Sequence, residues 1–230
     1  MAVLTRLRGS AFATVLMLAA LISLGVWQVQ RLHWKTALLA RIAAAEAAAP
    51  VPLPATPMPF AKVQASGTWL PGTALYGVEL RGQTLGAWLI QPLATPTGVL
   101  LVNRGWVDAA HPPPPASGPA RLVGYVREGE HAHWFSPADD PATRRFFTLD
   151  PAAIGAALGQ PAAPYVLVTL DDSAGQAAAG QMAAGEAAPV PATALPRPPN
   201  DHLSYALTWF GLALVLVVVF GLYVRKVLRQ

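Results

Sequence analysis

Two long runs of residues without a single charge lie near the ends of this 230-residue chain, and no other feature limits its architecture as strongly. The first run is residues 10–27 (SAFATVLMLAALISLGVW), and the second is residues 203–224 (LSYALTWFGLALVLVVVFGLYV). At a rise of 1.5 Å per residue, helices of these lengths extend about 27 and 33 Å, close to the roughly 30 Å of a bilayer's hydrocarbon core. We therefore predict two transmembrane helices. The first is expected to remain as an anchor, because it is longer than the apolar region of a cleavable signal peptide.

Basic residues near these runs predict which way the chain crosses the membrane. Arg225, Lys226 and Arg229 follow the second run directly, whereas only Arg197 precedes it closely. Because lysine and arginine collect on the cytoplasmic side, the C-terminus is expected in the cytoplasm, and two spans bring the N-terminus to the same side. For a chain in a bacterial inner membrane, the long loop between the spans then faces the periplasm.

Charge and composition exclude several classes of protein. Residues 28–201 hold 11 basic and 12 acidic side chains, so the loop lacks the basic face that nucleic acid requires. The chain has no cysteine, which excludes disulfides, thiolate catalysis and cysteine-ligated zinc or iron–sulfur clusters. No nucleophile elbow, phosphate-binding loop, dinucleotide fingerprint or zinc-protease motif occurs, and we expect no enzymatic activity.

Short apolar runs separated by glycine and proline make up the middle of the loop. They predict a β-rich (α+β) extracytoplasmic domain built on an antiparallel sheet or partly closed barrel. One helix is marked by Asp150 as N-cap, Pro151 at its first position and Gly159 after its end. The seven predicted strand segments are residues 62–70, 74–80, 85–93, 99–107, 121–127, 145–149 and 165–170.

Two further segments of the loop are expected to connect the β-rich domain to the transmembrane helices. The proline-rich stretch before the β-rich domain predicts an extended connector. The stretch of alanine, glycine and proline after it predicts a flexible tether that returns the chain to the membrane. The complete predicted division is a cytoplasmic N-terminus (1–9), the first transmembrane helix (10–27), its helical extension (28–49), the connector (50–59), the β-rich periplasmic domain (60–171), the tether (172–202), the second transmembrane helix (203–224) and a cytoplasmic C-terminus (225–230).

His131 and His133 are spaced so that both imidazoles could lie on one side of a strand, with Asp139 nearby. Such a pair suits copper or zinc. The surrounding segment, GEHAHWFSPADDP, is rich in turn residues. We therefore favour a solvated loop and expect no metal site there.

His202 stands one residue before the second apolar run, with Tyr205 and Trp209 following at helical spacings of three and seven. The three side chains therefore share one helical face at the edge of the membrane. Neutral imidazole suits haem iron and an aromatic face can stack on a porphyrin, so His202 is a candidate axial ligand. The alternative is that histidine and tryptophan serve here only as interfacial anchors.

Trp27, Arg31 and Trp34 recur at i, i+4 and i+7 where the first run ends, and Gln28 aligns with Lys35. A Trp–Arg–Trp stripe at the water boundary is typical of an aromatic belt with cation–π support. It could equally be a docking face for a partner helix or for a ligand that carries propionates.

Six blocks of sequence, in the same order along the chain, resemble the surfeit locus protein 1 family. They are GVWQVQRLHWK (25–35), GTWLPG (67–72), VLLVNRGWV (99–107), GYVREGE (124–130), residues 139–150 and NDHLSYALTWFGLAL (200–214). The resemblance implies a role in the biogenesis of haem–copper cytochrome c oxidase, in which bacterial members are thought to aid delivery of haem a. The implied partners are the catalytic subunit of the oxidase, haem a synthase and membrane lipid.

The same resemblance makes His202 the residue expected to contact haem a. It makes Trp27, Gln28, Arg31, Trp34 and Lys35 motif positions without assigning a role to each, and of these Trp27, Arg31 and Trp34 are candidate haem contacts. This sequence departs from the expected pattern at two places. Asp201 stands where the family pattern leads us to expect asparagine, and it would orient the neighbouring imidazole or repel haem propionates. A phenylalanine, Phe146 or Phe147, stands where we expect tryptophan.

Two other functions fit parts of the sequence. One is a protein-only scaffold that stabilises an intermediate of oxidase assembly without binding haem. The other is a periplasmic enzyme or ligand sensor held by two anchors. The missing catalytic motifs and the short predicted cytoplasmic ends count against the last of these.

Overall fold

The computed structural model describes residues 2–171 and 188–229, which belong to two compact units. The first unit is Met1–Ala43 with Arg197–Gln230, and the second is Ala44–Pro196. The first part of the predicted tether, residues 172–187, lies outside the described residues.

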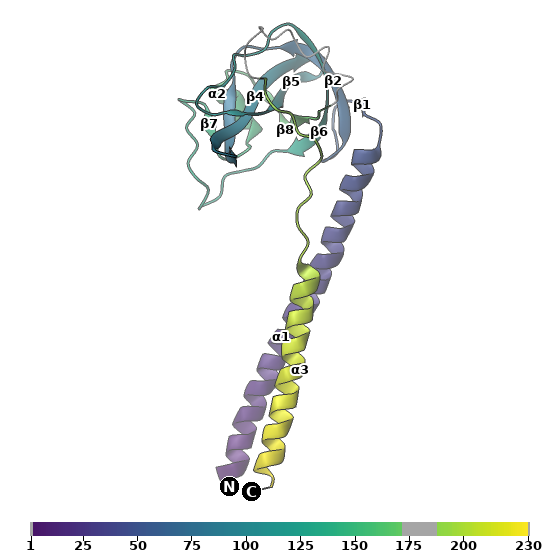
Figure 1. The fold of residues 1–230 in the computed structure, drawn as a ribbon, viewed down its shortest axis with the longest axis vertical. Helices are drawn as coiled ribbons and strands as arrows, with labels where there is room; N and C mark the ends of the chain where they lie inside the picture. Colours follow the sequence, from purple (N-terminus) through teal and green to yellow (C-terminus); the bar gives the residue numbers. More distant parts are fainter. Residues whose placement is uncertain (1, 172–187, 230) are drawn as a thin grey trace. The chain divides into compact units, whose positions relative to one another are not determined.

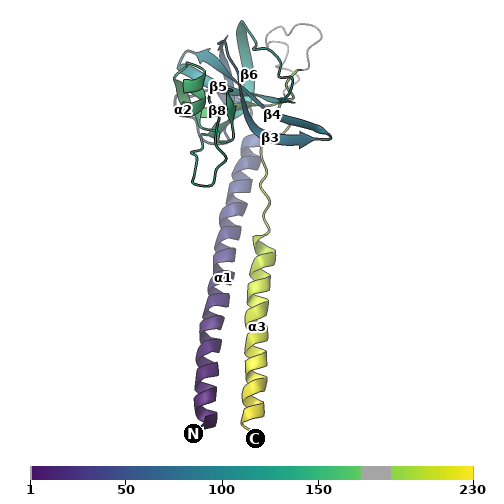
Figure 2. The same cartoon turned by 90° about the vertical axis from the view of Figure 1, so that its left-hand side faces the viewer.

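Two helices form the first unit. α1 (Ala2–Ala47) contains the first apolar run and α3 (His202–Val227) contains the second. Both are long and apolar enough to cross a membrane. They lie side by side, with both ends of the chain at the same end of the pair (Figures 1 and 2). α1 runs on beyond the apolar run because residues 28–47 contain neither glycine nor proline and are rich in alanine and leucine.

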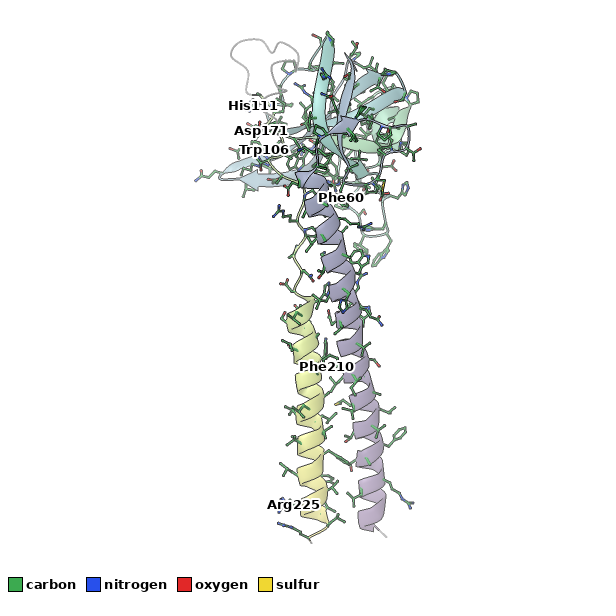
Figure 3. All side chains as sticks on the ribbon, turned by 90° about the vertical axis from the view of Figure 1, so that its right-hand side faces the viewer. Phe60, Trp106, His111, Asp171, Phe210 and Arg225 are labelled. Atoms are coloured by element: carbon green, nitrogen blue, oxygen red, sulfur yellow. The ribbon has the colours of Figure 1, made fainter. Side chains whose placement is uncertain are left out.

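Small side chains bring the two helices together. Gly25 of α1 is buried, and the ring of Phe210 on α3 occupies the space beside it (Figure 3). Ala206 and Ala213 of α3, one turn to either side of Phe210, are also buried. Glycine and alanine allow helix backbones to approach closely, which is the usual way in which membrane helices pack.

Five strands of the second unit close into a barrel. They pair in the order β2-β6-β8-β5-β4, and β4 pairs again with β2 at Ala94 and Leu93. The predicted β-rich domain between two apolar helices is therefore confirmed, with a barrel that closes fully. The strands of the barrel are β2 (Lys62–Trp69), β4 (Thr84–Thr95), β5 (Gly98–Asp108), β6 (Pro119–Glu128) and β8 (Ala162–Thr169).

One pairing in the barrel differs from the antiparallel sheet that was predicted. β5 and β8 run parallel, with Leu101 opposite Val166 and Val102 opposite Leu167. A parallel pair needs a crossover connection, and this one contains β6, β7 (Arg145–Phe146) and α2 (Pro151–Ala157). The long connection between β5 and β8 is therefore what a parallel pair requires.

Two hydrophobic cores lie on opposite faces of the same strands. Leu100 and Val102 of β5 belong to the first core, whereas Leu101 between them belongs to the second. Because both faces of β5 are covered, its apolar residues follow one another without alternating with polar residues. The second core includes Phe146 and Ile154, so β7 and α2 cover that side of the barrel.

α2 has the caps that its sequence predicts. The Asp150 carboxylate accepts hydrogen bonds from the backbone N–H groups of Ala152 (2.9 Å) and Ala153 (3.2 Å). Pro151 occupies the first turn, and Gly159 after the helix has a φ of 69°. The prediction for this helix is confirmed.

Three shorter pairings extend the sheet around the barrel. β3 (Ala74–Arg81) pairs with β4 along its length, and β7 adds to β3 only at Leu75 and Tyr76. β1 (Val51–Pro52) lies in the proline-rich connector and runs parallel to β2. Val190, within the predicted tether, exchanges two 2.8 Å backbone hydrogen bonds with Trp106 of β5. Parts of both connections are therefore bound to the barrel.

A buried polar network links β4 to two loops. Gln91 is fully buried, and its Nε2 donates to the carbonyl groups of Leu70 (3.0 Å) and Ala116 (2.8 Å). Its Oε1 accepts from the Ala116 N–H (3.0 Å) and from Nη1 of Arg104 (2.9 Å). The Arg104 guanidinium lies over the ring of Trp69, and burial lowers the pKa of Arg104. Every polar atom of the Gln91 amide is thus paired, as burial requires.

Candidate functional site

His202 is the first residue of α3, and its partner lies on the other helix of the first unit. Nδ1 of His202 is 2.7 Å from Oε1 of Gln28 on α1. Gln28 is 9% exposed and His202 is half-buried. The bond therefore joins the two apolar helices through side chains that are 174 residues apart in sequence.

The partner atom determines which imidazole nitrogen carries the proton. An amide oxygen can only accept a hydrogen bond, so Nδ1 of His202 is the donor. In a neutral imidazole the other nitrogen, Nε2, then holds a free lone pair. Histidines that bind metals commonly donate their second ring N–H to an oxygen in this way. The geometry therefore leaves one nitrogen of His202 available to a metal centre.

Trp27 lies beside the same imidazole. The two ring centroids are 6.5 Å apart at an interplanar angle of 85°, an edge-on contact. Trp27 remains 50% exposed, so part of its surface is open to a ligand. The structure thus brings together two of the predicted haem-contact residues from two different helices.

Arg31 and Trp34 form a second pair on α1. The Arg31 guanidinium carbon lies 4.6 Å from the centroid of the Trp34 ring, and both side chains are exposed. The predicted cation–π contact is confirmed. An exposed guanidinium at this position can also pair with a carboxylate.

Tyr205 and Trp209 follow His202 on α3 as the helical spacing predicts, but they are not joined to it. Among the described residues, neither makes a hydrogen bond or ring contact with His202. Tyr205 is 56% exposed and Trp209 is half-buried. Their predicted role as haem contacts stays a prediction.

Asp201 does not orient the imidazole. Its side chain makes no capping hydrogen bond at the start of α3, and in the described part of the chain no hydrogen bond or ion pair links its carboxylate to His202. The Asp201 backbone carbonyl accepts from the Ser204 hydroxyl at 2.7 Å. The side chain that bonds to the imidazole is Gln28 and not Asp201.

Sequence reasoning missed this role of Gln28. The residue was aligned with Lys35 along α1, whereas its important neighbour is on the other helix. The available signal was its spacing of three from Gly25, because positions i and i+3 of a helix lie on the same side. In an apolar helix, a polar residue on the same side as a glycine indicates a side that packs against a second helix.

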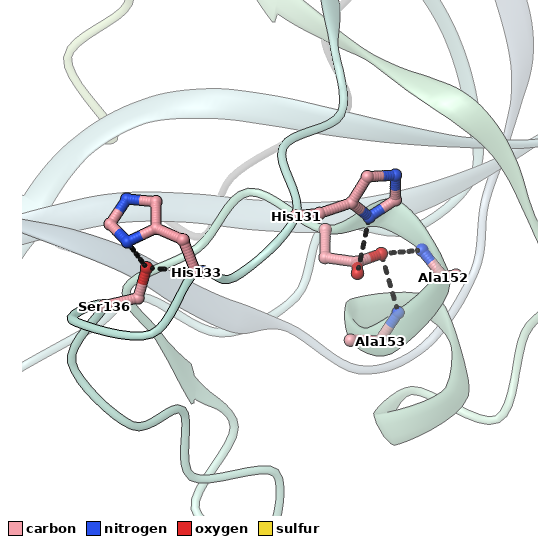
Figure 4. A network of polar contacts seen from close by, with 6 residues as sticks. His131, His133, Ser136, Ala152 and Ala153 are labelled. Atoms are coloured by element: carbon pink, nitrogen blue, oxygen red, sulfur yellow. Dashed lines mark hydrogen bonds and ion pairs between the residues drawn. The ribbon is translucent and has the colours of Figure 1, made fainter.

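The two histidines of the β-rich unit contact different partners. Nδ1 of His131 lies 3.5 Å from the Asp150 carboxylate, whereas Nδ1 of His133 lies 3.0 Å from the Ser136 hydroxyl (Figure 4). Oδ1 of Asp139 accepts from the backbone N–H groups of Phe147 and Thr148. Within residues 2–171 and 188–229, no cluster of three or more histidine, aspartate or glutamate side chains could hold a metal ion.

Comparison with known proteins identifies similar chains. A sequence model of the SURF1 family matches residues 15–214. The chain is 27% identical to a SURF1-like protein of Rickettsia conorii, over 94% of this chain and 91% of that protein. It is 28% identical to surfeit locus protein 1 of Xenopus tropicalis, over 92% of this chain and 73% of the other. For surfeit locus protein 1 of Homo sapiens the identity is 29%, over 83% and 69%.

Proposed function

We propose that this chain, which belongs to the SURF1 family, serves in the assembly of haem–copper cytochrome c oxidase. Its proposed task there is to carry haem a toward the catalytic subunit. The observation that carries the haem proposal is the 2.7 Å bond between His202 and Gln28, because in the neutral imidazole it places the proton on Nδ1 and leaves the Nε2 lone pair free. Haem a is here a cargo that the protein binds and releases, and no catalytic turnover is proposed.

The residues around His202 fit such a cargo. Nε2 of His202 offers a neutral nitrogen ligand for iron. Trp27 presents a half-exposed aromatic ring beside it, and aromatic surface favours contact with a porphyrin. Arg31 supplies an exposed cation that suits a propionate.

The proposed location is a bacterial inner membrane, with both termini in the cytoplasm and the β-rich unit in the periplasm. Arg225 and Lys226 occupy the last turn of α3, at the end of the helix pair where both termini lie (Figures 1 and 3). Basic residues at that end support a cytoplasmic position. His202, at the opposite end of α3, would then lie near the periplasmic surface, where haem a synthase and the oxidase subunit are its proposed partners.

The test is the optical spectrum of the full-length protein purified in detergent from cells that make haem a. Wild type should carry haem a, and His202→Ala should lose it or show a changed spectrum. His33→Ala is the matched control, because His33 is an exposed histidine of the same helix pair and should leave the haem content unchanged. Wild type without haem, or His202→Ala with an unaltered spectrum, refutes the proposal.

A second candidate function is a protein-only scaffold. It is favoured by the edge of β3: beyond Tyr76, within the described residues, this strand pairs only with β4. A free strand edge can bind an extended segment of a partner chain. Measuring haem a per remaining oxidase in cells that lack the protein separates the two functions. A haem carrier predicts haem-deficient oxidase, whereas a scaffold predicts fewer complexes with full haem content.

A further inference from the structure

The bond between Gln28 and His202 does more than join two helices. Gln28 lies well inside α1, whereas His202 is the first residue of α3. An imidazole without such a partner could exchange its proton between both nitrogens. Here the acceptor is an amide oxygen from a side chain that is itself buried. A buried amide that lost this bond would be left with an unpaired polar atom, so the contact is expected to persist.

We propose that Gln28 is a positioning residue, which holds His202 as the Nδ1–H tautomer and so reserves Nε2 for the iron of a bound haem. The proposal rests on the proposed haem-binding function, and it adds the residue that selects the ligating atom. Gln28 acts through His202 and does not itself contact the iron.

The chemistry of the bond explains why an amide suits this role. Donation from Nδ1–H to an oxygen raises the basicity of Nε2 and fixes the direction of the ring. Glutamine accepts the bond without a negative charge, which would be costly beside an apolar span. The bond is also stronger in a setting of low dielectric than it would be in water.

The first experiment needs no haem. The full-length protein, labelled with ¹⁵N-histidine and purified without haem in detergent, is studied by ¹⁵N NMR at a pH where His202 is neutral. The His202 signals are identified by their loss in His202→Ala. Wild type should show a protonated Nδ1 and an unprotonated Nε2, and Gln28→Leu should show a mixture of both tautomers.

Matched variants separate this role from a general effect on folding. Gln30→Leu makes the same change two residues away on an exposed position of α1 and should leave the His202 tautomer as in wild type. Gln28→Glu keeps an acceptor oxygen, charged or neutral, and should restore the Nδ1–H form. If wild-type His202 is protonated at Nε2, or if Gln28→Leu leaves the tautomer unchanged, the proposal is wrong.

The second experiment uses the protein loaded with haem a. Gln28→Leu should weaken haem binding about 10- to 100-fold, the usual effect of removing a partner of a metal-binding histidine. It should also raise the reduction potential of the haem, because a less basic ligand stabilises ferric iron less, whereas Gln28→Glu should lower it. An unchanged affinity and potential in Gln28→Leu contradicts the proposal.

The two experiments also distinguish the two proposals. Wild type that binds no haem refutes the haem-carrier function, while the NMR result still decides whether Gln28 sets the tautomer. The opposite outcome is that wild type binds haem through His202, while the haem-free protein has the proton of His202 on Nε2. That outcome refutes the role of Gln28 but is consistent with the haem-carrier function.

Discussion

The Cε1 atom of Phe210 lies 2.6 Å from the position that a Cβ atom would take on Gly25. Any side chain at position 25 therefore meets the aromatic ring of the other helix. Because Gln28 is one turn away on the same side of α1, this contact helps set the distance at which Gln28 and His202 can bond. The packing of two apolar residues thus supports the polar contact of the candidate site.

Gly25→Ala is expected to destabilise the helix pair, although alanine is the better helix former. Helix propensity favours alanine by about 1 kcal/mol, but the added methyl group overlaps the Phe210 ring, and overpacking of this kind costs about 1–3 kcal/mol. The measurement is thermal unfolding of the full-length protein in detergent, followed by circular dichroism. Gly25→Leu should lower the midpoint further.

Gly211→Ala provides the control, since a Cβ at Gly211 meets nothing within 4 Å. This variant should unfold at the wild-type temperature or slightly above it. Equal stabilisation by Gly25→Ala and Gly211→Ala would mean that the ring of Phe210 does not limit position 25.

The sequence was sufficient to predict the elements but not every pairing between them. The apolar runs, the caps of α2 and most strands follow from local patterns. Closure of the barrel depends on Thr68 and Trp69 meeting Ala94 and Leu93, which is a contact between distant segments. Local pattern does not encode such pairings, because strands of the same composition can be arranged in several orders.

The candidate site, too, could be predicted from the sequence only in part. His202 could be singled out because it directly precedes an apolar run and shares a helical face with two aromatic residues. The pairing of His202 with Gln28 could not be predicted, because helical spacing relates residues on one helix only and Gln28 belongs to the other helix. Tyr205 and Trp209 were linked to His202 by that spacing, and the structure joins neither to it by a ring contact.

Gln91→Leu is expected to destabilise the β-rich unit by about 3 kcal/mol, because it leaves the buried partners of the Gln91 amide without hydrogen bonds. The carbonyl of Leu70, both backbone groups of Ala116 and the Arg104 guanidinium each lose a bond. The measurement is thermal unfolding monitored by near-ultraviolet circular dichroism, to which Trp69 beside Arg104 contributes.

Gln64→Leu is the matched control for that change. Gln64 accepts one exposed hydrogen bond from Arg121, and loss of an exposed contact costs under about 0.5 kcal/mol. Similar midpoints for Gln91→Leu and Gln64→Leu would show that the buried network contributes little.

The Asp140 carboxylate is expected to titrate below its usual range. Hydrogen bonds from the hydroxyl of Thr143 and from its backbone N–H lower the pKa of Asp140 in the folded protein. A carboxylate with a lowered folded pKa contributes stability above its unfolded pKa, and this contribution is lost as the pH falls through the folded pKa. Thr143→Val should therefore raise the pKa of Asp140 toward the ordinary value, as measured by ¹³C NMR of the carboxyl group.

Thr97→Val tests whether that effect is local. Thr97 lies in the turn between β4 and β5, where its hydroxyl is 3.1 Å from that of Thr95, and its loss should leave the titration of Asp140 unchanged. An Asp140 pKa that does not move in Thr143→Val would exclude the threonine hydroxyl as the cause.

Substitutions of Gly105 and Gly98 test how the segment around Val190 is bound to the barrel. Both glycines lie in β5 with positive φ, 130° and 125°, which costs a residue with a side chain on the order of 1–3 kcal/mol. A Cβ at Gly105 would also collide with the Val190 backbone, whereas a Cβ at Gly98 meets nothing within 4 Å. Gly105→Ala should therefore release the segment around Val190, and Gly98→Ala should not.

Amide hydrogen exchange of the full-length protein measures this difference. In wild type the N–H groups of Val190 and Ala192 donate 2.8 and 3.1 Å hydrogen bonds to the carbonyls of Trp106 and Thr169, so both should exchange slowly. Gly105→Ala should speed exchange at these two amides, while Gly98→Ala should lower global stability and leave their local protection in place. Equal exchange in the two variants would show that backbone strain alone, and not the contact with Val190, makes glycine necessary at position 105.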